Sequence, residues 1–535
     1  MRSKTVLFFV LLCLPLTGFA YNHQQALFWV ASHVPQGSAL LHHQQVADVY
    51  AANQFQPIWY QYKTLQAFET RLEFIALADV SDHFYQRLLE LKQARQQNRW
   101  QEYDVLATDT LLSYISYAEN SPELGKGWFF GGRVEHIPDP SVLALEELKP
   151  VIQSDNLLIY INQLDSANKD YDNYLIAAQA MQPLTESYLA KYRQNKRLLR
   201  RGDKMSFKPE LVARLQSVGI DVAAIDGDNG WFDKELEHAV IAFQKLHGLK
   251  PDGVIGPKTQ NWINKSVENR IRLVALNAQR LRIWPTQRDH IILVNIPQYE
   301  MAFWRGGEQV FESNVIVGRP SRKTPLIDTR MNAVILNPGW NVPRKIMVKD
   351  ILPKAFDSVE YLSEHNYEIV RSWQNREVLD PQNVDWDNLS PNSFPYRLRQ
   401  TSGPYNALGR YKFNTPNKNA IFLHDTPAKN LFNEHRRAFS SGCIRVERSA
   451  QLADFLMAEL AVKPVDPSSL EPSETKSVSL RQRIPVHIIY QTAWIEQGQV
   501  QYRDDVYKYD FLSKSSNFDA KMTKIVDLNK LLTAQ

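Results

Sequence analysis

The hydrophobic pattern of the chain changes its period near residue 290. Before that point, apolar residues recur at intervals of three and four in segments such as 64–77 and 171–193, which predicts amphipathic helices. After it come short runs rich in Val, Ile and aromatic residues, such as 291–296 and 309–317, broken by Pro and Gly. A chain that separates helical from strand patterns in this way is predicted to be multidomain α+β.

Length and turn signals divide the chain into several parts. At 535 residues it should hold about two to four domains. We expect a signal peptide at 1–20, a helical scaffold at 21–200, a compact three-helix unit at 201–265, a linker helix at 266–287, a mainly β domain at 288–462 and a C-terminal extension at 463–535. The extension contains two further predicted strands, 484–492 and 494–502, and we expect its last ~20 residues to be poorly ordered.

The N-terminus has the features of a secretory signal peptide. Arg2 and Lys4 precede the apolar run 6–16, and Gly18-Phe19-Ala20 offers small residues at a cleavage site. The run is shorter than the roughly 18 residues that suggest a membrane-spanning helix, and no later stretch is long and apolar enough. We therefore expect a secreted protein without a transmembrane segment, cleaved near Ala20.

The charge balance gives no reason to expect nucleic acid or an anionic membrane as a partner. The formal net charge is +4, and loss of Arg2 and Lys4 with the signal peptide leaves about +2. Aromatic residues make up 11% of the chain, which mildly favours sugar or peptide contact surfaces, although packing explains most of them.

Cys443 is the one cysteine that remains once Cys13 leaves with the signal peptide. It cannot form an internal disulfide, and a leftover thiol in an oxidising compartment is a candidate reactive group. His424 lies 19 positions earlier, and a nearby imidazole can take the proton of a thiol or pair with its thiolate. The alternative is a buried structural cysteine, because cysteine packs as a small hydrophobe.

His424 and Cys443 belong to a set of four motifs. In chain order they are Gly318 to Thr324-Pro325, Asn406-Ala407-Leu408-Gly409, His424, and Ser440-Ser441-Gly442-Cys443-Ile444-Arg445. Their order resembles the catalytic domain of the L,D-transpeptidases of bacterial cell walls. The resemblance implies a mainly β catalytic domain with Cys443 as nucleophile and His424 as general base, no metal or organic cofactor, and a periplasmic location. Ser441 departs from it, because many members carry a second histidine at that position.

The resemblance also implies a substrate. The expected donor is a peptidoglycan stem tetrapeptide, cut between a diamino acid at position three and D-Ala at position four. The side-chain amine of a second stem would then open the thioester and form a 3→3 cross-link. Backbone N–H groups near Gly442 and Cys443 are the expected oxyanion donors. Ser441 and Arg445 are expected beside them, at the substrate.

Two charged neighbours of the pair have alternative roles. Arg445 could bind a substrate carboxylate, or it could form a structural ion pair with Glu447 or Asp454. Asp425 could orient His424, but neighbours along a strand point to opposite faces, so we expect its side chain to lie on the other face.

The predicted three-helix unit carries a second resemblance. Its residues Ala239–Gln244, Gly248-Leu249, Asp252-Gly253, Gly256 and Thr259 resemble the peptidoglycan-binding domain. The resemblance implies binding to the wall polymer, and the alternative is a packing module that orients its neighbours.

About 70 residues between Asn337 and Gly409 do not continue the strand pattern. An insertion of that length in a compact sheet is usually functional or disordered, and its aromatic content argues against disorder. We interpret residues 340–405 as a lid over the active site, with an added packing subdomain as the alternative.

Other functions stay open at this point. The expected partners are peptidoglycan stem peptides, with other cell-wall synthases as further candidates. Cys443 and His424 could equally serve an L,D-carboxypeptidase or amidase, with water or another amine as acceptor. A non-catalytic wall-binding scaffold is disfavoured by the intact pair, and a cysteine protease acting on proteins is disfavoured by the adjacent wall-binding unit.

Overall fold

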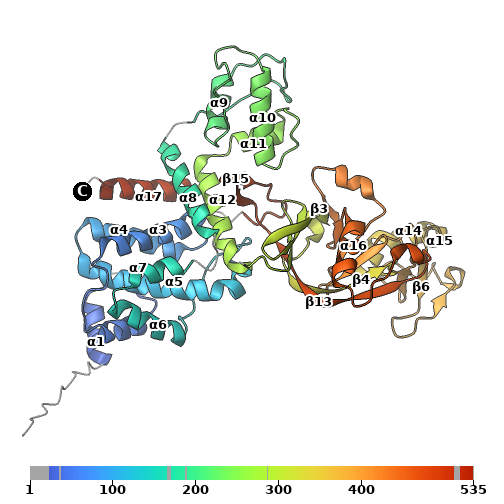
Figure 1. Cartoon of the computed structure of the whole chain (residues 1–535), viewed down its shortest axis with the longest axis horizontal. Coiled ribbons are helices and arrows are strands. Elements are labelled where there is room, and N and C mark those ends of the chain that lie inside the picture. Colours follow the sequence, from blue (N-terminus) through green and yellow to red (C-terminus); the bar gives the residue numbers. More distant parts are fainter. Residues whose placement is uncertain are drawn as a thin grey trace, which may run out of the picture.

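The computed structural model describes residues 23–34, 38–165, 170–186, 189–285, 287–510 and 518–533. The expected signal peptide at 1–20 lies outside these residues, and so does Cys13. Figure 1 shows a body of helices at one end, a body of strands at the other, and a small helical unit that stands apart above them. No helix in the described part of the chain has the length and apolar character needed to cross a membrane.

The N-terminal body is the helical scaffold that the pattern predicts. Its longest helix is α5 (Trp100–Trp128), which packs against α4 (Asp82–Gln96), and α4 in turn packs against α3 (Tyr62–Ala78). The remaining helices are α1 (His23–Ser32), α2 (His43–Ala52), α6 (Val142–Gln153), α7 (Leu157–Gln163) and α8 (Tyr171–Met181), with a 3-10 turn at Gln182–Glu186. One apolar core runs through these helices and continues into the elements that follow.

The last helix of the chain returns to this scaffold. α17 (Phe518–Thr533) packs on α4 (Figure 1). Its Phe518, Met522 and Ile525 are buried. The expectation of a poorly ordered tail is therefore wrong for this segment, because a periodic apolar face finds a partner at the opposite end of the sequence.

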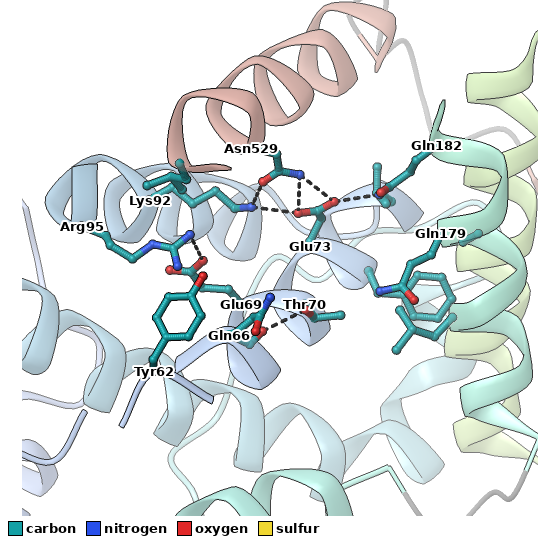
Figure 2. Close-up of a pocket in the computed structure, with 15 residues that line it drawn as sticks. Tyr62, Gln66, Glu69, Thr70, Glu73, Lys92, Arg95, Gln179, Gln182 and Asn529 are labelled. Carbon is teal, nitrogen blue, oxygen red and sulfur yellow. Dashed lines mark hydrogen bonds and ion pairs between the residues drawn. The ribbon is translucent and has the colours of Figure 1, made fainter. Parts of the chain in front are cut away.

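Figure 2 shows polar side chains that connect α17 to the scaffold. They line a cavity of about 260 Å³. Asn529 of α17 donates to Glu73 at 3.1 Å, and Lys92 pairs with the same carboxylate at 2.8 Å. Arg95 pairs with Glu69 at 3.0 Å. The four charged side chains of this cavity are thus matched within the fold, which identifies the cluster as structural.

The three-helix unit forms at the predicted places. Its helices are α9 (Lys208–Gln216), α10 (Lys234–Leu246) and α11 (Pro257–Ile263). Asp233 caps α10 by accepting from the Leu236 N–H at 2.9 Å, and Pro257 occupies the first position of α11.

The predicted linker helix lies in the interior of the molecule. α12 (Val267–Arg280) is buried on nearly all sides, against α3, α8 and the strand β14 (Ala493–Glu496), and ends in a 3-10 turn, Leu281–Ile283. Arg280 is fully buried, pairs with Asp510 at 2.8 Å and donates to the Phe129 carbonyl at 3.0 Å. Since breaking a buried ion pair is strongly destabilising, α12 couples the scaffold to the C-terminal segment.

A nine-stranded sheet forms the second body. Its strand order is β11-β3-β12-β10-β9-β4-β13-β1-β2, and β2 also pairs with β3, so the sheet closes on itself. The strands are β1 (Ile291–Asn295), β2 (Glu300–Arg305), β3 (Glu308–Gly318), β4 (Asp328–Leu336), β9 (Tyr411–Asn414), β10 (Leu423–His424), β11 (Ala438–Ser440), β12 (Ile444–Val446) and β13 (Lys476–Ile489). Helix α16 (Ser449–Leu460) packs against β4, β9 and β13.

Part of the expected C-terminal extension belongs to this sheet. The expectation that residues 463–535 lie outside the β domain is wrong for β13, which lies between β4 and β1, antiparallel to the first and parallel to the second. Buried Val486 and Ile488 supply core contacts that the sheet would otherwise lack. The single strand expected at 494–502 is instead a hairpin of β14 with β15 (Gln499–Tyr502), because the chain turns at Gln497-Gly498 with positive φ.

The insertion at 340–405 folds as a subdomain with its own apolar core. Its four-stranded sheet has the order β5-β8-β6-β7, with β5 (Trp340–Asn341), β6 (Tyr367–Val370), β7 (Val378–Leu379) and β8 (Arg397–Gln400). Four short helical segments, Arg344–Ile346, Met347–Ile351, α14 (Leu352–Asp357) and α15 (Glu360–Glu364), cover it. A separate core shows that the insertion is a packed unit and not a loose loop.

Candidate active site

The predicted pair lies on β10 and directly before the adjacent strand β12. β10 and β12 run parallel, with Leu423 opposite Ile444 and His424 opposite Arg445. Side chains alternate between the faces of a strand, so buried Leu423 and Ile444 point into the core. Cys443 directly precedes β12, and its side chain therefore shares the other face with His424. The charges of Lys412 and Arg445 act on both the imidazole and the thiol, which indicates that the two groups lie in one neighbourhood.

The main chain fixes the orientation of the His424 ring. The imidazole is buried, and its Nδ1 is hydrogen-bonded to the backbone carbonyl oxygen of Asp425. A carbonyl only accepts, so Nδ1 carries the proton and Nε2 keeps a free lone pair. Burial, reinforced by the positive charge of Arg445, lowers the pKa of His424 to about 3. At neutral pH this histidine is a neutral base.

The thiol of Cys443 is also neutral at rest. Burial raises its pKa above the ordinary value, and this outweighs a backbone hydrogen bond from Phe422 and the charges of Lys412 and Arg445. Its Sγ lies 3.8 Å from the Ala420 carbonyl oxygen, within the range of a weak S–H donor. The pair is thus a thiol beside a neutral imidazole, and reaction would begin with a proton transfer.

A chain of hydrogen bonds holds the loop that presents Cys443. Thr324 Oγ1 donates to the Gly442 carbonyl at 2.8 Å, and Ser440 Oγ donates to the Cys443 carbonyl at 2.6 Å. Gly442 has φ +124°, which glycine adopts readily and other residues rarely. Its N–H donates to Ser440 Oγ at 3.1 Å, so it would have to leave that partner to serve as an oxyanion donor.

Ser441 connects the same loop to the insertion. Its Oγ accepts from Arg322 Nη1 at 2.9 Å, and Arg322 Nη2 pairs with Asp350 at 2.8 Å. Sequence reasoning missed this link: Arg322 lay within the recognised 318–325 motif, but nothing in the sequence marked Asp350 as its partner.

Two cations face the pair. Among the described residues Arg445 has no ion-pair partner, neither Glu447 nor Asp454, and its buried Nε has no hydrogen-bond partner. Lys412 lies opposite His424 in β9, with its Nζ 4.2 Å from the Phe422 ring centroid. Lys412 was not predicted, although its place between two apolar residues of the strand was a usable signal.

The Asp425 side chain is hydrogen-bonded away from the His424 ring, and its charge acts to raise the pKa of His424 against the larger effect of burial. Its carboxylate accepts from the Arg410 N–H at 2.8 Å and from Ser449 Oγ at 2.8 Å, and it pairs with Lys429. The expectation that it points to the opposite face is confirmed. The larger contribution of Asp425 to His424 comes from its backbone carbonyl.

Comparison with known proteins places these domains in families. Residues 289–478 match the family of the L,D-transpeptidase catalytic domain, residues 209–263 match the "Putative peptidoglycan binding domain", and residues 44–175 match a scaffold domain. The chain therefore carries a catalytic domain of the L,D-transpeptidase family, joined to a peptidoglycan-binding domain. The predicted arrangement of helical region, three-helix unit and mainly β catalytic domain is confirmed.

A relative of known sequence points the same way. The chain is 44% identical over 251 residues to a Haemophilus influenzae protein named "Putative L,D-transpeptidase", a match that covers 46% of this chain. The chain spans about half (50%) of the length of that relative.

Solved structures of L,D-transpeptidases also match. One from Stackebrandtia nassauensis is 14% identical, with 57% of this chain and 97% of the other covered and a TM-score of 0.20. One from Xylanimonas cellulosilytica is 15% identical, with 56% and 100% covered and a TM-score of 0.17.

Proposed function

We propose that this protein is a cysteine-dependent L,D-transpeptidase that forms 3→3 cross-links in peptidoglycan. The proposal rests on one observation above all: Cys443 directly precedes the strand that pairs in parallel with the strand of His424, and Nε2 of His424 is left as a proton acceptor. The catalytic-domain family and the peptidoglycan-binding domain support the same substrate class.

The first half-reaction forms a thioester. His424 Nε2 takes the proton of Cys443 Sγ, and the thiolate attacks the carbonyl carbon of the third residue of a stem tetrapeptide. The bond from that carbonyl to the nitrogen of D-Ala breaks, and the imidazolium returns its proton to the departing amine. Arg445, which has no carboxylate partner among the described residues, is suited to bind a carboxylate of the donor stem.

The second half-reaction transfers the acyl group. The side-chain amine of a second stem attacks the thioester carbonyl, His424 takes the proton lost by that amine, and the Cys443 thiolate leaves. The thiolate then regains the proton from the imidazolium, so the enzyme ends as it began. A water in place of the amine would give a tripeptide and make the enzyme an L,D-carboxypeptidase.

The remaining parts fit the same function. We propose that the insertion at 340–405 acts as a lid, since Asp350 and Arg322 connect it to Ser441 beside the nucleophile. We also propose a periplasmic location, because the sequence of residues 1–20 has the features of a signal peptide and the substrate lies outside the cytoplasm.

The test uses the mature protein and a Cys443→Ala variant, each incubated with disaccharide-tetrapeptide and analysed by mass spectrometry. Transpeptidation predicts a dimer formed with loss of one D-Ala, absent with the variant. Tripeptide without dimer would show a carboxypeptidase. The enzymatic proposal fails if there is neither product nor a covalent adduct on Cys443.

A further inference from the structure

A broad groove runs between the peptidoglycan-binding domain and the catalytic domain. It has a volume of about 1050 Å³ and is lined by α11 and α12 on one side and by the turn 297–300 and residues 435–437 on the other. The segment 503–508, from beyond β15, also lines it. The groove is therefore built from four segments of the chain, within residues 248–273, 297–323, 435–437 and 503–510.

The groove is strongly cationic. Eight lysine or arginine residues line it against four acidic residues, an excess as large as the formal net charge of the whole chain. On the side of the peptidoglycan-binding domain and α12 these cations are Lys258, Lys265 and Arg272. Burial, helped by the nearby charges of Arg270 and Arg272, lowers the pKa of Lys265, and the charges of Asp510 and Asp504 act in the opposite direction.

Five further cations line the opposite wall and the C-terminal segment: Lys323, Arg436, Arg437, Arg503 and Lys508. Among the described residues, none of the eight cations forms a side-chain ion pair within 4.0 Å. Their polar contacts are instead to neutral groups: Lys323 donates to the Tyr507 carbonyl at 2.9 Å, and Arg437 donates to the Tyr299 carbonyl at 3.0 Å.

The four acidic residues of the groove offset only part of this charge: the charge of Glu300 acts on Arg437 and Arg503, and the charges of Asp504 and Asp510 act on Lys265. Asp510 pairs with buried Arg280 at 2.8 Å, and Asp504 accepts from Trp262 Nε1 at 2.8 Å. Asp505 accepts from the Tyr509 and Asp510 N–H groups, each at 2.8 Å, and Glu300 accepts from Gln298. A concave surface with an excess of positive charge concentrates anions.

One end of the groove reaches the back of the nucleophile loop. Lys323 lines the groove, and its neighbour Thr324 holds the Gly442 carbonyl at 2.8 Å. Tyr507, also in the lining, donates to the Gly318 carbonyl at 2.7 Å and accepts from the Thr324 N–H at 3.0 Å. The other end lies on α11 of the peptidoglycan-binding domain.

We propose that this groove binds the carboxylate groups of peptidoglycan stem peptides, and so carries a wall strand from the peptidoglycan-binding domain toward Cys443. The inference rests on the proposed function for the identity of the strand. Charge and position together favour this ligand: a polymer with repeated carboxylates matches repeated unpaired cations, and the groove connects a wall-binding domain to a wall-modifying site.

The test measures co-sedimentation with purified sacculi that have been stripped of phosphate polymers. All chains carry Cys443→Ala, so turnover plays no part. Lys258, Arg436 and Lys508 are exposed, and their combined change to Glu should weaken binding about tenfold. The matched control changes exposed Arg481, Arg483 and Lys524 to Glu, with the same change in net charge, and should bind within about twofold of the parent.

Two further arms complete the test. The milder triple change of the same groove residues to Gln should give an intermediate loss, which separates charge from misfolding. Sacculi whose stem carboxylates have been amidated should bind the parent about as weakly as they bind the Glu variant. Equal binding by groove variant and control would overturn the proposal. So would a loss seen only with wall that retains phosphate polymers, which would identify a phosphate ligand. Failure of transpeptidation with intact groove-dependent binding would overturn the proposed reaction and leave the groove in place.

Discussion

Arg322 pairs with Asp350 across the boundary between the catalytic sheet and the inserted subdomain. The pair is partly buried, with 12% of the Arg322 side chain and 33% of the Asp350 side chain exposed. The same guanidinium donates to Ser441 Oγ at 2.9 Å, two residues before the nucleophile. The position of the insertion and the position of the Cys443 loop are thus coupled through the side chain of Arg322.

Removing this coupling should loosen the insertion. In an Asp350→Asn variant the charge-assisted bonds weaken, and we expect transpeptidation to fall about fivefold and proteolysis within 340–405 to become faster. The matched control is Arg371→Ala, which removes an exposed ion pair with Glu377 that lies wholly inside the insertion. If both variants keep full activity and equal resistance to protease, the pair has no role in positioning the lid.

The protonation states of the pair predict the pH profile. Because burial lowers the pKa of His424 to about 3, the base stays neutral well below the ordinary histidine range. The thiol, whose pKa burial raises, stays protonated above neutral pH. We therefore expect kcat/KM to be flat between about pH 5 and 8, and alkylation of Cys443 by iodoacetamide to be slow at pH 7. An acid limb near pH 6.5 would instead indicate a histidine with an ordinary pKa.

His424 itself should be needed for the proton transfer and not for the fold. A His424→Gln variant should lose about 10²-fold or more in kcat, in line with removal of a general base. Its thermal stability should stay close to that of the parent, because glutamine can still donate to the Asp425 carbonyl. Retention of more than a tenth of kcat would assign the base to another group.

Local motifs predicted the pair, while tertiary contacts decided its surroundings. His424 and Cys443 could be found because each lies within a short motif at the end of a strand. Lys412 and Asp350 reach the site only through strand pairing and through packing of the insertion, which no local pattern encodes. The cationic groove was missed because a net charge of +4 is small over the whole chain, and only folding gathers the unpaired cations on one surface.

The same distinction between local motifs and tertiary contacts explains which parts of the fold could be predicted. Helix α10 begins after an N-cap at Asp233, and α11 begins with Pro257 in its first turn. Both are local signals. The central place of β13 and the return of α17 depend on partners more than a hundred residues away. Sequence patterns predicted at most the secondary structure of these segments. They did not predict which elements the segments pack against.

Gly442 should not tolerate a side chain. Its φ of +124° is unfavourable for any other residue, and an added Cβ would lie 3.2 Å from Ile421 Cδ1. A Gly442→Ala variant should therefore lose about 1–3 kcal/mol of stability and nearly all turnover. The control is Gly307→Ala, at φ +82° in a hairpin with open space around it, which should lower Tm but keep turnover. Full activity of Gly442→Ala would mean that this loop relaxes without harm to the nucleophile.

Asp425 should matter for stability and not for the chemistry of His424. Burial alone would raise the pKa of its carboxyl, but hydrogen bonds from Lys429, the Arg410 N–H and Ser449 hold it below its ordinary value. A carboxylate with a lowered pKa stabilises the fold above about pH 4, and this contribution is lost as the pH falls through its folded-state pKa. An Asp425→Asn variant should therefore lose about 2 kcal/mol of unfolding free energy at pH 7, and the difference from the parent should shrink below about pH 4. Its kcat should stay within about threefold, because the backbone carbonyl that holds His424 Nδ1 is unchanged.

Asp466→Asn, an exposed cap of a short turn, provides the control for a surface carboxylate. A loss of kcat that exceeds the loss of folded protein would instead show that the Asp425 carboxylate acts on His424.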